Sequence, residues 1–278
     1  MNDLLAGIVI LYNPNSEVIK NIKTYIEYLD VLYIVDNSPF ENSQLIKSLK
    51  KADKVHYIFH NENKGISYSL NEVLRLVKNR YKWLLTMDQD SRFADGSFYN
   101  YQSFLKQLPP NTYGICPVYS DKNSMAVLEK DLFTVVDRCI TSGTIINVDI
   151  SIKCGGFDEN LFIDEVDFEF CYRCKKNGYK LLQYNKKILI HKIGESIFKS
   201  FLGFQFSILN ENYLRNYYVY RNKLYISRKY PERKWQIYIE LAKWTVKVCL
   251  FENNKIKKMK YAYKGYKDFQ NKKMGRIN

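Results

Sequence analysis

Strand-like and helix-like segments alternate through the first 90 residues of the chain. Apolar runs that indicate buried strands lie at residues 5–12, 31–35, 55–59 and 81–88. Between them, apolar residues recur at helical spacing in residues 18–29, 43–49 and 66–77. Strands that alternate with helices through short links favour a mostly parallel sheet covered by helices on both faces. The sequence therefore predicts an α/β fold.

Each of the four apolar runs ends in a polar cluster. The clusters are Tyr12-Asn13, Asp36-Asn37-Ser38, residues 61–65 and Asp88-Gln89-Asp90. Ligands of such sheets bind beyond the carboxyl ends of the strands. Because neither G-x-G-x-x-G nor G-x-x-x-x-G-K-[ST] occurs in the chain, no motif supports a dinucleotide site or a P-loop. The four polar strand ends together predict a ligand site of another kind.

Two carboxylates, Asp88 and Asp90, follow the fourth run at a spacing of two residues. In extended backbone such residues point to the same side of the strand. Hard oxygen ligands in that arrangement suit Mg²⁺ or Mn²⁺ bound together with substrate phosphates. An ordinary acidic turn after a strand is the alternative interpretation.

The second half of the chain has its own signals. Residues 140–144 form a small, hydroxyl-rich segment between strand-like residues, and Gly155-Gly156 indicates a turn. Residues 162–173 begin a helix whose first turns are acidic, which is favourable with the helix dipole. Beyond about residue 198 the pattern becomes helical, aromatic and basic, which places a coarse domain boundary there.

The positive charge is concentrated in this last segment. The whole chain carries a net charge of +14, and residues 229–278 hold 14 Lys and Arg against four acids, a net +10. A broad apolar helix face accompanies the charge, formed by Trp235, Ile239, Ala242, Val246 and Leu250. Such a helix suits an anionic membrane surface. It equally suits packing against the rest of the chain or a homodimer, and the charge alone also suits nucleic acid or a solvated face.

Six scattered cysteines show no disulfide framework, which favours reduced thiols and a cytoplasmic location. The apolar run at residues 4–11 lacks a basic lead and a cleavage site, and is expected to be a first strand rather than a signal peptide. No apolar stretch reaches the ~20 residues that a membrane span needs. A protein that is peripheral on the inner face of the plasma membrane is compatible with all three observations.

A series of short motifs occurs in fixed order along the chain. The motifs are I-L-Y-N-P (10–14), I-V-D-N-S (34–38), N-x-N-x-G-I-S-x-S-L-N (61–71), L-T-M-D-Q-D-S (85–91), I-T-S-G (140–143), G-G-F-D-E-x-L-F-I-D-x-V-D-x-E (155–169), G-Y (178–179) and H-x-x-G (191–194). Together they resemble one enzyme family, the inverting family 2 glycosyltransferases of GT-A fold. Within that family the likeness is strongest to bacterial rhamnosyltransferases that use dTDP-rhamnose, and it covers about residues 5–225.

The resemblance implies a domain plan. A GT-A catalytic domain with a Rossmann-like central sheet is expected at residues 1–198, with a nucleotide-binding half at about 1–95 and an acceptor half at about 96–198. A helical, aromatic and basic extension is expected at residues 199–278.

The resemblance also assigns a metal site and a catalytic base. It makes Asp90 a direct ligand of Mn²⁺ or Mg²⁺ and gives Asp88 a contact with the nucleotide ribose or the metal. It makes His191 the residue that completes the metal site. A set of ligands with both oxygen and nitrogen atoms favours Mn²⁺. It makes Asp167 the general base that inversion requires. Asp164 is the alternative base, whereas Glu169 is expected to orient Arg173.

The remaining assignments concern the donor and the acceptor. By resemblance, Asp36 binds the pyrimidine base, Tyr12 stacks beside it, Asn63 and Gly65 form the loop next to the nucleotide, and Gly65 lets the backbone approach closely. We expect Arg221 to reach the diphosphate. The acceptor or sugar pocket is expected to be lined by Thr141, Ser142, Gly143 and Asp164.

The function implied is transfer of L-rhamnose from dTDP-rhamnose to a glycan, such as a polyprenyl-diphosphate-linked one, in bacterial cell-surface polysaccharide synthesis. A galactosyl or other hexosyl transferase that uses a UDP-sugar is the first alternative. A sugar-1-phosphate nucleotidyltransferase would need a Gly-rich basic loop, which Asn13-Pro14-Asn15-Ser16 is not. A nucleic-acid-binding protein would leave the acidic strand ends unexplained, so we expect no nucleic-acid partner.

Overall fold

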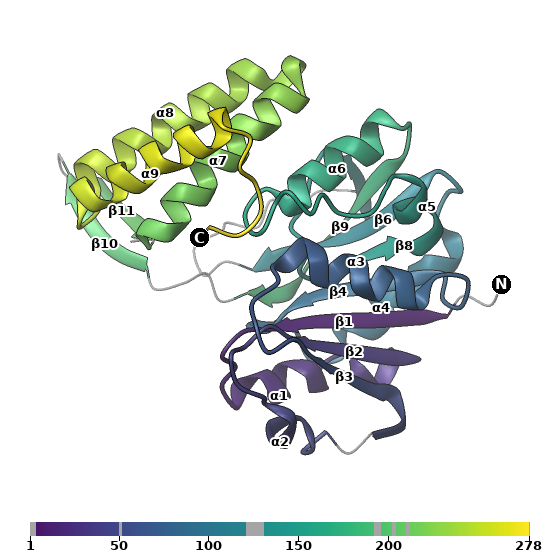
Figure 1. Cartoon of the computed structure of the whole chain (residues 1–278). Helices are drawn as coiled ribbons and strands as arrows, with labels where there is room; N and C mark the ends of the chain where they lie inside the picture. The colour runs from purple at the N-terminus through teal and green to yellow at the C-terminus, as the bar shows by residue number, and fades with distance from the viewer. Residues whose placement is uncertain are drawn as a thin grey trace. The chain divides into compact units, whose positions relative to one another are not determined.

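The computed structural model describes residues 4–49, 52–120, 131–191, 196–201, 204–209 and 212–277 (Figure 1). The chain forms two compact units. The first comprises Met1–Asp158 and Asp167–Lys192, and the second comprises Glu159–Val166 and Ile193–Asn278. The short segment 159–166 therefore belongs with the C-terminal residues, although it precedes a helix of the first unit. The predicted division at residue 198 stays a prediction.

A nine-stranded sheet forms the centre of the first unit, in the order β3-β2-β1-β4-β8-β6-β9-β5, with β7 paired to β9. The strands are β1 (Leu5–Leu11), β2 (Val31–Asp36), β3 (Val55–Phe59), β4 (Trp83–Asp88), β5 (Ser91–Phe93), β6 (Thr112–Ser120), β7 (Phe133–Val136), β8 (Thr144–Asn147) and β9 (Lys180–His191). Strands β1 to β4 are parallel to one another. Strand β8 runs antiparallel to both β4 and β6, so the sheet becomes mixed in its second half.

Helices and short 3₁₀ turns accompany the sheet (Figure 1). The helices are α1 (Glu17–Lys23), α2 (Ser43–Ile46), α3 (Ile66–Val77), α4 (Ser97–Ser103), α5 (Val148–Lys153) and α6 (Val166–Lys176), and the 3₁₀ turns are η1 (Ile26–Tyr28), η2 (Ala52–Lys54) and η3 (Phe104–Gln107). The α/β fold predicted from strand and helix alternation is confirmed. The core of this unit combines aliphatic strand residues with an aromatic group that includes Tyr25, Phe93, Phe98 and Tyr101, all fully buried.

The first predicted helix is shorter than its apolar periodicity indicated. Helix α1 ends at Lys23, and a separate 3₁₀ turn follows. The reason is local: the Thr24 hydroxyl donates to the carbonyl of Asn21 at 2.7 Å, the Thr24 amide donates to the same carbonyl at 3.1 Å, and the Tyr25 amide donates to the Ile22 carbonyl at 3.2 Å. Threonine side chains that bond nearby carbonyls compete with the helical ladder. By contrast, α3 has the bounds that its apolar spacing predicted.

The second unit contains three long helices and a hairpin. The helices are α7 (Tyr213–Lys229), α8 (Lys234–Phe251) and α9 (Lys255–Gln270), with a 3₁₀ turn η4 (Pro231–Arg233) before α8. Strands β10 (Ser196–Phe201) and β11 (Phe204–Leu209) pair antiparallel. The predicted helical extension is confirmed, whereas the hairpin was not predicted. Gly265 lets α9 approach α7, because a Cβ at that position would lie 2.4 Å from the carbonyl oxygen of Tyr217.

Helix α8 buries one side and exposes the other. Ile237, Leu241 and Val248 are buried. The exposed fractions of Trp235 and Ile239 are 76% and 55%, and Val246 and Leu250 are similarly open. The apolar face predicted from the sequence is thus the open face of α8. None of the helices in the described part of the chain is long and apolar enough to cross a membrane.

Candidate active site

The polar ends of the parallel strands meet at one edge of the sheet. Strands β1 and β2 pair Leu11 with Asp36, and β1 and β4 pair Ile10 with Asp88. Tyr12, the next residue after β1, is 48% exposed at this edge. The strand register therefore places Tyr12, Asp36 and Asp88 at neighbouring strand ends, as the sequence pattern predicted.

Gln89 connects the end of β4 with the end of β1 through hydrogen bonds. Its side-chain oxygen accepts from the Tyr12 amide at 2.9 Å, and its side-chain nitrogen donates to the Tyr12 carbonyl at 3.1 Å. The Asn21 side chain donates to the Gln89 carbonyl at 2.9 Å. Sequence reasoning treated this residue only as the spacer between two aspartates, and nothing in the local sequence identifies a partner 77 positions earlier.

The backbone between the two aspartates corrects one expectation. Strand β4 ends at Asp88, and Gln89 and Asp90 form a turn before β5. The expectation that extended backbone aligns the two side chains is therefore wrong. Asp88 is half-buried and its amide donates to the Ser142 hydroxyl at 3.2 Å, whereas Asp90 is exposed.

The residues at this edge fit a divalent cation. Asp88 and Asp90 supply the oxygen ligands that Mg²⁺ and Mn²⁺ prefer. Strand β5 pairs with β9 so that the backbone of Ser91, the residue after Asp90, lies opposite that of His191. The side chain of His191 lies outside the described ones. Among the side chains that the structure describes, no group of three or more His, Cys, Asp or Glu forms a metal site.

The hydroxyl-rich segment at residues 141–143 packs directly beside the end of β4. The Thr86 hydroxyl donates to the Thr141 carbonyl at 2.5 Å, and the Gly143 amide donates to the Thr86 carbonyl at 2.8 Å. Gly143 has a φ of 78°. A Cβ there would lie 2.9 Å from the Leu189 side chain, so this close approach requires glycine. Thr141, Ser142 and Gly143 are thereby fixed next to Asp88.

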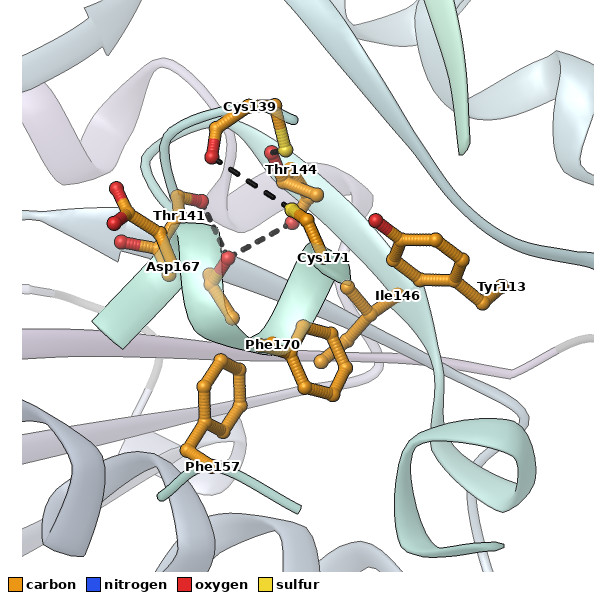
Figure 2. A pocket seen from close by; sticks show the side chains of 10 residues that line it. Tyr113, Cys139, Thr141, Thr144, Ile146, Phe157, Asp167, Phe170 and Cys171 are labelled. Carbon is orange, nitrogen blue, oxygen red and sulfur yellow. Dashed lines mark hydrogen bonds between the residues drawn. The ribbon is translucent and has the colours of Figure 1, made fainter. Parts of the chain in front are cut away.

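Asp167, the second residue of α6, lies beside Thr141 (Figure 2). It is half-buried, and its carboxylate accepts from the Phe168 amide at 2.9 Å. Both residues line a cavity of about 10 Å³, which has room for roughly one water molecule and not for a sugar. The other residues that line it are Thr86, Tyr113, Cys139, Thr144, Ile146, Phe157, Phe170 and Cys171. Phe157 and Phe170, which line the same cavity, stack with their ring centroids 4.4 Å apart.

Glu169, which follows Asp167 on α6, has a structural task. It is fully buried and forms a bidentate ion pair with Arg173, with N–O distances of 3.0 and 2.6 Å. Arg173 also donates to the Cys154 carbonyl at 2.6 Å. The prediction that Glu169 orients Arg173 is confirmed, which leaves Asp167 and Asp164 as candidate bases.

Asp36 is a fully buried carboxylate with three donors from the described residues. They are the Ser38 amide at 2.9 Å, the Asn42 side chain at 2.9 Å and the Tyr57 hydroxyl at 2.5 Å. Burial and the hydrogen bond to Asp36 raise the pKa of Tyr57, so this hydroxyl stays protonated and donates. A carboxylate offers about four acceptor positions; because Asp36 is fully buried, a ligand N–H could use the remaining position only if a neighbouring group moves aside.

The loop before α3 contains Asn63 and Gly65, which are expected to lie next to the nucleotide. The Gly65 amide donates to the Asn63 side chain at 3.0 Å, and Gly65 has a φ of 88° at the start of the helix.

A hydrogen-bond network around His60 was not predicted from the sequence. His60 contacts the Asn37 side chain through Nδ1 at 2.7 Å and Glu72 through Nε2 at 2.8 Å.

Two of the predicted site residues belong to the second unit. Asp164 pairs with Arg215 at 3.2 Å. Arg221 is fully buried, and it donates to the Tyr217 hydroxyl and to the Asn222 side chain, each at 3.1 Å. The predicted diphosphate contact of Arg221 stays a prediction.

Comparison with known proteins adds a relative and several structural neighbours. The chain is 28% identical over 250 residues to the dTDP-rhamnosyl transferase RfbF of Shigella flexneri, covering 82% of this chain and 81% of the relative. TarS 1–349 of S. aureus in complex with UDP-GlcNAc superposes over 96% of this chain and 73% of its own, with a TM-score of 0.54 and 12% identity. GalNAc-T7 with UDP, GalNAc and Mn²⁺ superposes over 68% of this chain and 43% of its own, with a TM-score of 0.54 and 15% identity.

At such low identity the structural neighbours concern the fold alone, and they agree with the GT-A-like fold predicted from the sequence. The family model described as glycosyl transferase family 2 matches residues 8–155, which is more than half of the chain. The matched residues include β1 from Ile8 onward, β2 to β4 and the hydroxyl-rich segment beside Asp88. The chain is therefore a glycosyltransferase that belongs to glycosyl transferase family 2.

Proposed function

We propose that this enzyme transfers L-rhamnose from dTDP-rhamnose to a glycan acceptor with inversion at the anomeric carbon. The observation that carries the proposal is the convergence of Asp36, Asp88 and the segment 141–143 at the carboxyl edge of the parallel strands. The similarity to a dTDP-rhamnosyl transferase over most of both chains favours the rhamnosyl donor. A UDP-sugar donor is the second candidate, favoured by the complex of TarS with UDP-GlcNAc.

The donor would bind along the strand ends. Asp36 would accept a hydrogen bond from the pyrimidine base with its remaining acceptor position, and the exposed ring of Tyr12 would stack nearby. The left-handed Gly65 lets the backbone that follows Asn63 approach the nucleotide. Asp88, Asp90 and His191 would hold Mn²⁺ or Mg²⁺. Such an ion supplies Lewis-acid stabilisation of the charge on the departing diphosphate.

Asp167 would take the proton from the acceptor hydroxyl as that oxygen attacks the anomeric carbon. Thr141, Ser142 and Gly143 would line the sugar or acceptor pocket, since Thr141 lies beside Asp167 and Ser142 bonds the Asp88 backbone. Asp164 is the alternative base or an acceptor contact.

Donor identity can be tested by thermal unfolding with a panel of sugar nucleotides and Mn²⁺. A ligand that binds only the folded protein raises its stability, by about 2.7 kcal/mol at a concentration 100-fold above Kd. We expect dTDP-rhamnose to raise the unfolding temperature more than UDP-galactose, UDP-GlcNAc or GDP-mannose. A larger shift with a UDP-sugar would replace the rhamnosyl donor by the second candidate, and no shift with any of them would contradict the proposal.

The second unit supports a proposed location at an anionic membrane surface on the cytoplasmic side, where a polyprenyl-diphosphate-linked acceptor would be found. The open face of α8 is flanked by exposed lysines at positions 234 and 243. At the connection to α9, a groove is lined by three lysines (255, 257 and 260) and by Ile256, which is 77% exposed, together with Glu252, Asn253 and Asn254. An apolar stripe bordered by cations matches the interface of an anionic bilayer, where each basic residue contributes about 1 kcal/mol.

We expect the intact protein to sediment with phosphatidylglycerol vesicles at low salt and to be released by high salt. The double variant Trp235→Ser and Ile239→Ser removes the start of the apolar stripe and should lose most of this binding. Tyr263→Ser, at another exposed aromatic of the same unit, is the matched control. Absence of vesicle binding at low salt would contradict the membrane location, and a doubled mass that the double variant abolishes would make α8 a protein interface.

A further inference from the structure

The segment before α6 is held by α7 through one side chain in particular. Asn222 is fully buried, and its side-chain nitrogen donates to the carbonyls of Ile163 at 2.6 Å and Asp164 at 3.0 Å. These two carbonyls belong to the segment 159–166, which groups with the C-terminal helices rather than with the sheet. One amide group therefore fixes two successive peptide units of the segment.

The peptide units held in this way are in a costly conformation. Asp164 and Glu165 have φ values of 61° and 64°, the left-handed region that residues with a Cβ rarely adopt in succession. Such a conformation persists only where surrounding groups enforce it. Helix α7 supplies those groups, because Arg215 pairs with Asp164 at 3.2 Å and Lys223 pairs with Glu165 at 2.8 Å.

A buried hydrogen-bond chain sets the orientation of the Asn222 amide. The Arg221 Nε donates to the Asn222 Oδ1 at 3.1 Å, which turns the amide nitrogen toward the segment. Arg221 also donates to the Tyr217 hydroxyl at 3.1 Å, and that hydroxyl donates to Asp268 of α9 at 2.9 Å. Burial raises the pKa of Tyr217 to about 12, so its hydroxyl stays a donor at neutral pH. The chain runs from α9 through α7 to the backbone of residues 163 and 164.

We propose that Asn222 is a positioning residue for the transfer reaction, oriented by Arg221. It holds the left-handed backbone of Asp164 and Glu165, and that backbone continues directly into α6, whose second residue is Asp167. The inference rests on the proposed role of Asp167 as base. In this account Arg221 orients Asn222 rather than contacting the diphosphate. That role agrees with its complete burial, with the guanidinium 5.1 Å from the ring centroids of both Tyr217 and Tyr218.

The test variant is Asn222→Asp. The shape of the side chain and its bond with Arg221 remain, and the new charge pairs with the guanidinium, so the fold is retained. The two hydrogen bonds to the segment are lost, because a carboxylate faces the carbonyls without a proton to donate. A small displacement of a reacting group can lower a rate by about 10²-fold. We therefore expect kcat for dTDP-rhamnose cleavage to fall about 10²-fold with the donor KM nearly unchanged.

Two further measurements separate positioning from general destabilisation. Hydrogen exchange at the amides of residues 164–167 should accelerate in Asn222→Asp, and this readout needs no activity. Ser227→Ala is the matched control, since Ser227 is a buried polar residue of α7 whose hydroxyl donates to the Leu224 carbonyl of the same helix at 2.8 Å. It should leave kcat and exchange at residues 164–167 unchanged.

If Asn222→Asp unfolds, Arg215→Gln provides the same test from an exposed position of α7, with the same expected fall in kcat. A folded variant with normal kcat, or with a raised donor KM and normal kcat, overturns the inference; the second result would return Arg221 and Asn222 to donor binding. A wild-type enzyme that cleaves none of the sugar nucleotides would instead refute the proposed function. The exchange measurement would still show whether Asn222 holds the backbone of residues 164–167.

Discussion

The substitution Asp167→Asn is expected to lower the rate of dTDP-rhamnose cleavage by ~10²–10⁴-fold, the usual contribution of a general base. The amide keeps the size of the side chain and its position beside Thr141, and its oxygen can still accept from the Phe168 amide. It cannot accept the proton of the attacking hydroxyl. Because the predicted donor contacts lie at other residues, we expect the donor-induced rise in unfolding temperature to persist.

Two comparisons make this result specific. Asp95→Asn, at an exposed carboxylate before α4, should retain the wild-type rate and serves as the control. Asp164→Asn tests the alternative base. An active Asp167→Asn protein together with an inactive Asp164→Asn protein would show that the base is Asp164.

The second large effect is expected for Asp90→Ala. Lewis-acid stabilisation by a divalent ion is worth several kcal/mol, so loss of a direct ligand should reduce donor cleavage below detection. Asp90 is exposed and lies in the turn between β4 and β5, so the fold should survive its removal. Independently of activity, Mn²⁺ should no longer increase the thermal protection that dTDP provides.

Chelation of the wild-type protein should reproduce the loss, and added Mn²⁺ should reverse it in the wild type and not in the variant. Asp95→Ala is the matched control for removal of one exposed carboxylate. Near-normal cleavage by a folded Asp90→Ala protein would remove the metal role assigned to this residue.

The parts of the fold that could be predicted are those encoded locally. The polar strand ends at Asp36 and Asp88 follow from where apolar runs stop, and the register of parallel strands then brings them to one edge. Helix α3 could be delimited because its apolar spacing and the left-handed Gly65 before it agree. Helix α1 could not, because the bond from the Thr24 hydroxyl to the Asn21 carbonyl competes with an apolar periodicity that continues beyond it.

The parts that could not be predicted depend on partners far away in the sequence. The side chain of Gln89 is held by the backbone of Tyr12, and the side chain of Asn222 donates to the carbonyls of residues 163 and 164. The diphosphate contact expected of Arg221 stays a prediction, and the tyrosine rings beside its guanidinium could not be predicted from the sequence. Helical periodicity identified the apolar face of α8, but it could not tell that Ile237 and Leu241 on another side would be the buried residues.

The central claim, inverting cleavage of a nucleotide-linked sugar, is tested most directly by the configuration of the sugar first released. Wild-type enzyme, dTDP-rhamnose and Mn²⁺ would be followed by proton NMR, with water as the acceptor and faster sampling than mutarotation. The account predicts that rhamnose appears first as the anomer opposite to that of the donor, and that Asp167→Asn abolishes the signal. Release with retained configuration, or no cleavage of any sugar nucleotide in the panel, would contradict it.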